Sequence, residues 1–135
     1  MTAVDTNVLS ALLTGTEKSS ARAVALLSAE TALLVSPVVY AELAGHPKGD
    51  EVSLKALLNA LRIDVDWTLT AVTWQLAAKR YRDYAGRRRK SRGGHPKRLL
   101  ADFIVGAHAT RAARRLLSFD KRIYHAAFPE LEVIS

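Results

Sequence analysis

The chain has 135 residues, of which 49% are apolar, and 20 Lys and Arg against 13 Asp and Glu give a formal charge of +7. This length and composition suit one folded domain over residues 1–135 with an ordinary buried core, and they exclude a disordered tail. The absence of cysteine excludes disulfide frameworks, thiolate zinc sites and cysteine nucleophiles.

The sequence carries no recognisable targeting or membrane segment. Its N-terminus, Met-Thr-Ala-Val-Asp, lacks the basic region of a signal peptide. The most apolar stretch, residues 31–44, is interrupted by polar residues and is shorter than the ~20 residues that a membrane-spanning helix needs. We therefore expect a cytoplasmic protein that does not insert into membranes.

The positive charge is concentrated in one segment. Residues 79–98 contain ten basic residues and one acid and carry +9, whereas the other 115 residues carry −2. The run of Arg and Lys with Gly93, Gly94 and Pro96 predicts a mobile basic loop at about residues 86–98. A cationic segment of this density indicates a polyanionic partner, and it has the electrostatic footprint of a nucleic-acid-binding segment. The candidate residues for this binding are Arg87, Arg88, Arg89, Lys90, Arg92, Lys97 and Arg98.

Hydrophobic patterns predict strands that alternate with helices. A short apolar segment at residues 3–4 is followed by predicted helices at 8–13 and 18–29, a strand at 32–36, and helices at 37–44 and 51–61. A strand at 63–67, helices at 69–84 and 100–114, and strands at 115–119 and 131–134 complete the chain. This alternation predicts an α/β fold whose central sheet is mainly parallel. Because the strand at 63–67 alternates apolar with acidic residues, we place it at an edge, with Asp64 and Asp66 facing outward.

Four acids fall on apolar elements rather than on polar faces. Asp5 and Asp120 come directly after apolar strands, where ligand sites gather in open parallel sheets. Glu42 lies on the helix that follows the second strand, and Asp102 lies in the first turn of an apolar helix. Each acid also has a structural explanation: a helix cap for Asp5, a helix dipole for Asp102, a turn for Asp120 and solvent for Glu42.

As a set, the four acids indicate a metal site. If they converge, their charges repel and raise one another's pKa values unless a cation neutralises them. Oxygen ligands without Cys or paired His select a hard ion such as Mg²⁺ or Mn²⁺, which suits phosphodiester hydrolysis. His46, His95 and His125 have no second histidine at the i, i+4 spacing of a metal site. We expect His108 to be packed inside the fold or at a dimer interface.

Several short motifs occur in the order found in one nuclease family. They are Val-Asp-Thr-Asn at 4–7, Tyr-Ala-Glu-Leu at 40–43, Leu-Ala-Asp-Phe-Ile-Val-Gly-Ala-His-Ala at 100–109, Leu-Ser-Phe-Asp at 117–120 and Phe-Pro-Glu-Leu-Glu-Val-Ile at 128–134. The chain resembles PIN-domain ribonucleases over essentially its whole length. It is most similar to the VapC-type toxins of toxin–antitoxin pairs, and the resemblance implies a three-layer α/β fold.

The resemblance also implies roles for single residues. The metal-binding and catalytic acids would be Asp5, Glu42, Asp102 and Asp120. Asn7 and Ser118 would support them through hydrogen bonds, and Ser118 keeps the hydroxyl of the Thr found in many relatives. The implied activity is Mg²⁺- or Mn²⁺-dependent hydrolysis of RNA, with a cognate antitoxin as partner and a homodimer as the assembly.

Two alternatives remain open from the sequence. One is a PIN nuclease that is not a toxin and processes RNA or DNA. The other is a non-catalytic RNA-binding module that uses the basic loop alone. That loop could instead bind an acidic antitoxin segment, and the sequence does not separate these uses.

Overall fold

A computed structural model of the chain describes residues 1–93 and 99–135. Within these residues the strands are β1 (Thr2–Val4), β2 (Leu33–Val35), β3 (Ile63–Val65), β4 (Arg115–Leu117) and β5 (Glu132–Ile134). The helices are α1 (Thr6–Thr14), α2 (Glu17–Ser28), α3 (Pro37–Ala44), α4 (Glu51–Ala60), α5 (Ala71–Lys90), α6 (Leu100–Ala112) and α7 (Lys121–Ala127). None of these helices combines the length and apolar character needed to cross a bilayer.

The five strands form one parallel sheet in the order β3-β2-β1-β4-β5. The chain moves outward from β1 through β2 to β3 and then crosses to β4 on the other side of β1. The strand order therefore reverses beside β1. In parallel sheets a crevice forms outside the carboxyl ends of the strands at such a point. β3 lies at an edge of the sheet, as its alternating pattern predicts.

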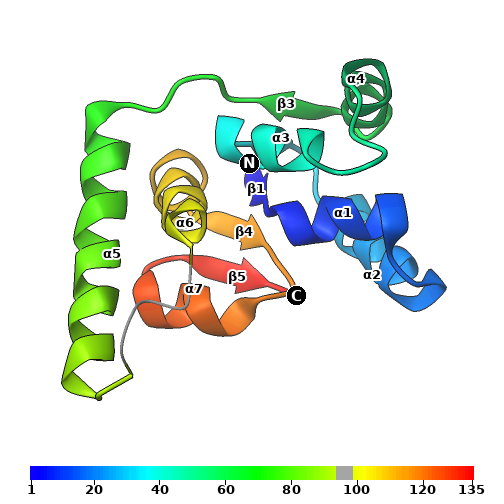
Figure 1. The fold of residues 1–135 in the computed structure, drawn as a ribbon. Coiled ribbons are helices and arrows are strands. Elements are labelled where there is room, and N and C mark those ends of the chain that lie inside the picture. Colours follow the sequence, from blue (N-terminus) through cyan, green and yellow to red (C-terminus); the bar gives the residue numbers. More distant parts are fainter. Residues whose placement is uncertain (94–98) are drawn as a thin grey trace.

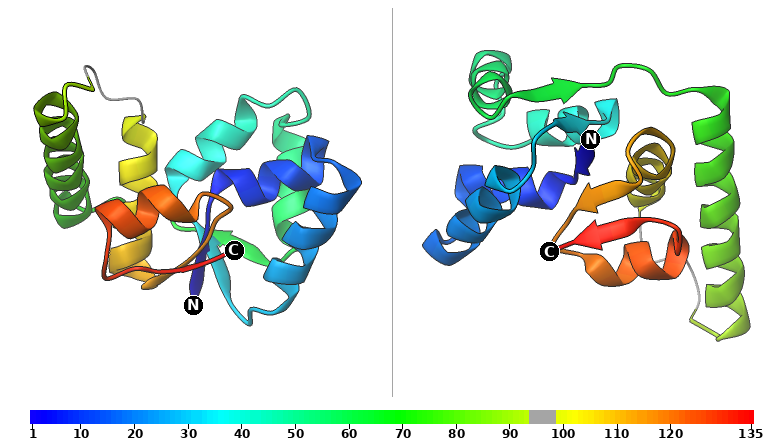
Figure 2. Two further views of the ribbon diagram at one scale, coloured as in Figure 1. Left: turned by 90° about the horizontal axis from the view of Figure 1, so that it is seen from below. Right: turned by 180° about the vertical axis from the view of Figure 1, so that it is seen from behind.

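Helices cover both faces of the sheet, which gives three layers. Figures 1 and 2 show α5, α6 and α7 on one side of the strands and α1 to α4 on the other. The long helix α5 packs on the outer side of α6 (Figure 1). The predicted three-layer α/β fold with a parallel central sheet is confirmed.

Polar side chains set the starts of the helices. A side-chain oxygen of the residue before each of α1 to α5 accepts a hydrogen bond from a backbone N–H of the first turn; these residues are Asp5, Thr16, Ser36, Asp50 and Thr70. Such caps satisfy N–H groups that have no partner within the helix. The first helical residue of α3 is proline, whose missing N–H costs nothing there.

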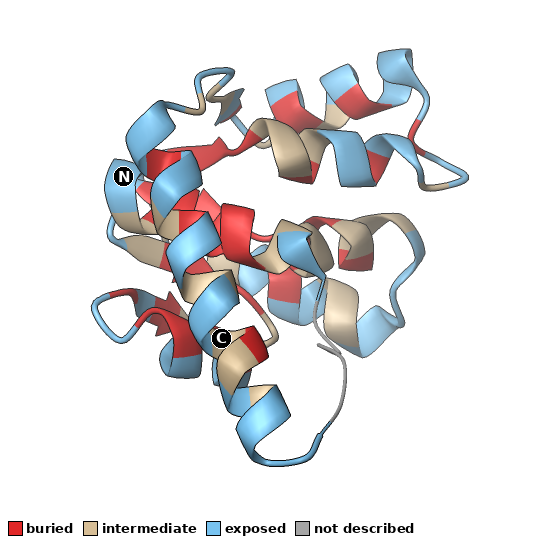
Figure 3. Cartoon of the chain, turned by 60° about the vertical axis from the view of Figure 1, so that its left-hand side comes forward, coloured by how far each residue is buried: buried red, intermediate tan, exposed pale blue. Residues whose placement is uncertain are grey.

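The core lies between the sheet and the inner faces of the helices. Figure 3 shows the buried residues concentrated on the strands and on the helix faces turned toward them. On the α6 side, the rings of Phe103 and Phe128 lie 6.4 Å apart, and Tyr81 of α5 packs on Phe103 at 5.2 Å. A Cβ at Gly106 would approach the Phe128 ring to 2.3 Å, so only glycine allows this contact.

One predicted feature was wrong, and one helix was not predicted. The basic loop was expected to begin near residue 86, but α5 continues to Lys90, so Arg87, Arg88, Arg89 and Lys90 are helical. Arg92 lies in the turn that follows, whereas Lys97 and Arg98 fall outside the described residues. Helix α7, directly after Asp120, was not predicted.

One of the two acids predicted for the edge strand also differs from expectation. Asp64 is exposed, as predicted, but Asp66 lies beyond the end of β3 and contacts His108, with 2.9 Å between Oδ2 and Nε2. His108 is 3% exposed, which confirms that it is packed inside the fold. Asp66 therefore connects the segment after β3 to α6, a contact that the alternating pattern of the edge strand does not predict.

Candidate active site

The four predicted acids come together at the carboxyl edge of the sheet. Asp5 follows β1, Asp120 follows β4 and precedes α7, Glu42 lies on α3, and Asp102 lies in the first turn of α6. All four line one cavity of about 240 Å³. The cavity is also lined by Thr6, Asn7, Ser10 and Tyr124. Four segments distant in sequence thus bring their carboxylates to the place where the strand order reverses.

Asp5 is the most constrained of these acids. It is 6% exposed, and its Oδ1 accepts a hydrogen bond of 2.8 Å from the Thr6 N–H at the start of α1. Its Oδ2 accepts from the Ser118 hydroxyl at 2.7 Å and the Tyr124 hydroxyl at 3.0 Å. Burial raises the pKa of Asp5, the three donors partly offset this rise, and the charge of Glu42 adds to it.

Asn7 and Ser118 connect β4 to the start of α1. The Asn7 side chain donates from Nδ2 to Ser118 Oγ at 3.3 Å, and its Oδ1 accepts from the Phe119 N–H at 3.1 Å. Ser118 Oγ also accepts from the Asp120 N–H at 3.0 Å. Both residues predicted as supports therefore lie in one hydrogen-bond network with Asp5 and the backbone of Asp120.

Thr6 and Tyr124 belong to the site but were not predicted. Thr6 donates from its hydroxyl to Glu42 Oε1 at 2.6 Å, which fixes the exposed carboxylate of α3 next to Asp5. Tyr124 is buried on α7, the helix that sequence patterns missed. Burial above all, and then the nearby charge of Asp5, raise the pKa of Tyr124, so its hydroxyl stays protonated and acts as a donor.

The sequence matches the family model of the PIN domain over residues 2–129. The chain belongs to the PIN domain family. PIN domains are nucleases, a class of hydrolases. The four carboxylates at the sheet edge therefore lie in a fold whose members cleave nucleic acids.

Solved structures share this PIN fold along nearly the full chain. A toxin–antitoxin complex from Klebsiella pneumoniae aligns with a TM-score of 0.67 and 18% identity, covering 100% of this chain and 97% of that one. FitAcB from Neisseria gonorrhoeae aligns with a TM-score of 0.68 and 23% identity at the same coverage. VapBC2 from Rickettsia felis, bound to a promoter DNA fragment, gives 0.60 and 16%, covering 98% and 96%. No curated protein matches the sequence at a significant level.

The chemistry of the cavity fits a hard divalent cation. PIN nucleases generally use divalent metal ions, and the described lining offers carboxylate, hydroxyl and amide oxygens without His or Cys. No three His, Asp or Glu residues of the described chain are gathered closely enough to hold a metal as they stand. Carboxylates that share a cavity repel one another, and the effect of Glu42 on the pKa of Asp5 shows this repulsion. A cation would offset it and draw the acids together.

Two of the predicted basic residues lie beside α7, the helix that follows Asp120. Arg87 and Arg88, in the last turn of α5, line a cavity of about 360 Å³ together with Arg122 of α7. Arg89 and Lys90 lie in the same turn and are exposed. We call the cavity lined by Arg87, Arg88 and Arg122 the arginine cavity, and the one lined by the four acids the acid cavity. Helix α7 contributes residues to both.

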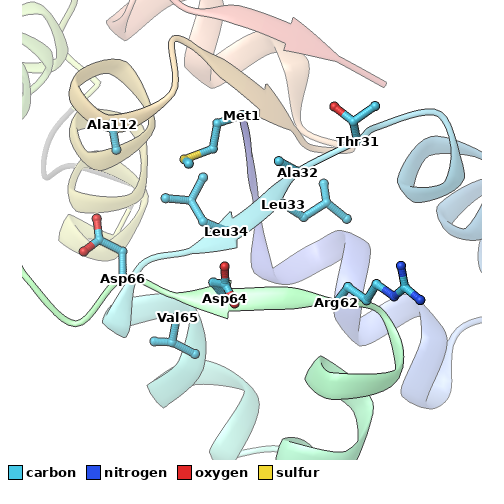
Figure 4. Close-up of a pocket in the computed structure, with 10 residues that line it drawn as sticks. All are labelled: Met1, Thr31, Ala32, Leu33, Leu34, Arg62, Asp64, Val65, Asp66 and Ala112. Atoms are coloured by element: carbon cyan, nitrogen blue, oxygen red, sulfur yellow. The ribbon is translucent and has the colours of Figure 1, made fainter.

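A further cavity of about 480 Å³ lies over β2 and β3 (Figure 4). Its lining includes Asp64 and Asp66 but none of the four acids of the site. The lining mixes apolar residues such as Met1 and Leu34 with the charged residues Arg62, Asp64 and Asp66 (Figure 4). This cavity is therefore separate from the one that the four acids of the site line.

Proposed function

We propose that this PIN domain, which spans the whole chain, is a VapC-type toxin. It would be a Mg²⁺- or Mn²⁺-dependent endoribonuclease that hydrolyses RNA phosphodiester bonds in the cytoplasm. The observation that carries the proposal is the convergence of Asp5, Glu42, Asp102 and Asp120 on one cavity at the point where the strand order reverses. This arrangement combines a nuclease fold with the oxygen ligands that a phosphate-bound divalent cation prefers.

Asp5, Glu42, Asp102 and Asp120 would hold the metal. When bound, Mg²⁺ or Mn²⁺ supplies Lewis acidity, which makes a water molecule more acidic and stabilises negative charge on the phosphate. Asp5 contributes a fixed carboxylate, because Thr6, Ser118 and Tyr124 hold both of its oxygens. Glu42 and Asp120 are the candidates for orienting the attacking water.

The basic residues of the α5 C-terminus would hold the RNA. Four carboxylates repel a phosphate backbone, and the arginines near the site offset that repulsion. Phosphate contacts from Arg and Lys provide affinity but carry no sequence information. We extend this role to Arg92, Lys97 and Arg98, as the sequence predicts.

The partners proposed are a cognate antitoxin and a second copy of the chain. The similar structures from Klebsiella pneumoniae and Rickettsia felis are a toxin–antitoxin complex and VapBC2 bound to promoter DNA, respectively. By analogy, an antitoxin would neutralise this chain and the toxin would form a homodimer. Growth arrest on expression, relieved by Asp5→Asn, would support the toxin assignment over a housekeeping nuclease.

Asp5→Asn is the decisive variant. It keeps the size of the side chain but removes the charge, and we expect cleavage of a broad RNA panel with Mg²⁺ or Mn²⁺ to fall by at least about 100-fold. Asp64→Asn, an exposed acid on β3 outside the cavity, is the matched control and should retain full activity. If the wild-type protein cleaves no RNA with either metal and still binds it, the chain is a non-catalytic RNA-binding module and the proposal fails.

A further inference from the structure

A second cavity lies between the last turns of α5 and helix α7, outside the carboxylate site. It has a volume of about 360 Å³, within the range of small-ligand pockets. Its described lining combines an apolar floor with a basic rim and contains no carboxylate: Tyr84, Ile123 and Ala126, then Arg87, Arg88, Arg122 and Ser91. A ligand that fits this lining has an apolar, flat part and a negative charge.

Arg88 is held in place at this cavity. Its Nη2 donates to the carbonyl oxygen of Gly93, and a Cβ at Gly93 would approach Arg88 Cζ to 2.7 Å. The glycine backbone therefore lies directly against the guanidinium. Arg88 Nε is buried and has no hydrogen-bond partner in the described part of the chain. The Arg88 guanidinium thus has a fixed position in the lining of the cavity.

Helix α7 joins this cavity to the acid cavity. Asp120 and Tyr124 line the acid cavity, whereas Arg122 and Ile123 line the arginine cavity. Because Ile123 and Tyr124 are consecutive residues, the two cavities lie on adjoining faces of the same short helix. α5 and α7 also lie on the same side of the sheet (Figure 1). A chain that crosses the start of α7 can reach both cavities.

We propose that the arginine cavity is a subsite for one unstacked nucleotide of single-stranded RNA, next to the nucleotide pair whose phosphate lies at the acid cavity. The base would lie on Tyr84, Ile123 and Ala126, and its phosphate would contact Arg87 and Arg122. The inference rests on the proposed nuclease function and adds a determinant of substrate choice, with Arg122, Ile123 and Ala126 as new residues.

The lining favours RNA over an acidic peptide. Unstacked bases bind to aromatic rings and arginine planes, and basic grooves follow the phosphate backbone. An acidic peptide could also use the arginines, but it would need an aromatic or apolar side chain beside its acids, whereas every nucleotide carries a flat base next to a phosphate. Proximity to the carboxylate cavity also favours the polymer that this cavity would cleave.

The test measures binding to RNA that cannot be cleaved during the experiment. The full chain carrying Asp5→Asn is titrated, with Mg²⁺, into labelled single-stranded RNA in which one nucleotide at a time lacks its base. We expect one position at which base removal weakens binding on the order of tenfold. Ala126→Phe should fill the cavity and weaken binding of intact RNA by the same factor, so that intact and abasic RNA no longer differ.

Two further variants complete the design. His125→Phe places the same ring on the same helix at an exposed residue outside the cavity, and it should leave binding unchanged. Arg122→Gln should weaken intact and abasic RNA equally and should lower the slope of log affinity against log salt by about 0.7. Because Ala126 and Arg122 are exposed, both variants should fold, and matching circular dichroism and melting temperature verify this.

The subsite is overturned if Ala126→Phe binds every RNA as His125→Phe does. It is also overturned if Ala126→Phe loses affinity only for a Glu-rich peptide, which would make the cavity a protein-binding site. The result is separable from the nuclease proposal. Cleavage without base-dependent binding refutes the subsite alone, whereas base-dependent binding without cleavage by the wild-type chain refutes the nuclease alone.

Discussion

Asp5 combines a structural and a chemical task within one side chain. One oxygen caps α1, and the other accepts two hydroxyl hydrogen bonds from Ser118 and Tyr124. A carboxylate has about four lone-pair sites, so three donors leave roughly one for a cation. The hydrogen bonds also limit the rise in pKa that burial causes. The surrounding donors thus keep a buried acid oriented and available for a metal.

Tyr124→Phe tests this support directly. The change removes the hydroxyl that donates to Asp5 Oδ2 but keeps the ring in the core. We expect Mg²⁺ affinity, measured by calorimetry, to fall about 10-fold, because groups that orient a metal ligand typically contribute 10–100-fold. Unfolding free energy should fall by about 1 kcal/mol. Tyr40→Phe, whose ring packs on Trp67 outside the cavity, is the control. Unchanged metal affinity in Tyr124→Phe would contradict this role.

At the scale of elements, the end of α5 was predicted wrongly because charged residues and a glycine interrupt its hydrophobic pattern. Gly86 and the following arginines suggested a loop, but arginine is a good helix former and glycine costs a helix only about 1 kcal/mol. Cations in the last turn also interact favourably with the helix dipole. α7 was missed because its seven residues give too short a period to recognise, although Ile123, Tyr124 and Ala127 are its buried face. Tyr124 was not predicted as a site residue because the helix that carries it was not predicted.

Two glycine-to-alanine substitutions should change the free energy of unfolding in opposite directions. Gly86 has no atom within 4 Å of an added Cβ, so Gly86→Ala should stabilise α5 by about 0.5–1 kcal/mol. In Gly106→Ala the new methyl would overlap the ring of Phe128, and the cost of overpacking, about 1–3 kcal/mol, should exceed the gain in helix propensity. Urea unfolding of both variants measures whether each substitution stabilises or destabilises the protein. A destabilised Gly86→Ala would show that the helix does not extend past residue 86 in solution.

The contact between Asp66 and His108 connects the segment after β3 to α6. The hydrogen bond from His108 lowers the pKa of Asp66 below its ordinary value of 3.8. A lowered folded-state pKa gives stability that is fully present above the ordinary value and is lost as the pH falls through the folded-state value. We expect Asp66→Asn to cost about 1 kcal/mol near neutral pH.

That cost should shrink when unfolding is measured at about pH 3, below the ordinary pKa of 3.8, because the carboxylate of the unfolded chain is then largely protonated and the stabilisation is being lost. Asp64→Asn, on the exposed part of β3, should show little cost at either pH. A cost for Asp66→Asn that stays constant across this range would mean that size or packing, rather than charge, is what Asp66 contributes.

Across the whole molecule, opposite charges are separated onto neighbouring surfaces. The acids that converge are spread over 116 residues of sequence. Strand ends placed Asp5 and Asp120 at the carboxyl edge of the sheet, whereas the grouping of all four acids was implied by the family resemblance. The hydroxyl donors of Thr6 and Tyr124 could not be predicted, because their partners depend on side-chain packing across elements. Composition alone identified the basic segment, but composition does not reveal that a helix carries Arg87 to Lys90.

A triple variant tests whether the separated positive charge binds RNA. Replacing Arg87, Arg88 and Arg89 with Gln removes three cations near the arginine cavity but none of the ligands proposed for the metal. RNA binding should weaken, and the slope of log affinity against log salt should fall by up to about 2, because each phosphate contact to single-stranded RNA contributes about 0.7.

The matched control replaces Lys18, Lys48 and Lys55, which lie on or near α2 and α4 and change the net charge by the same amount. If net charge alone attracted RNA, both triple variants would behave alike, whereas local contacts require the arginine variant to lose much more. Mg²⁺ affinity should change much less than RNA affinity in both variants, because neither variant removes a proposed metal ligand. An unchanged salt slope in the arginine variant would assign these cations to the antitoxin or to another acidic partner.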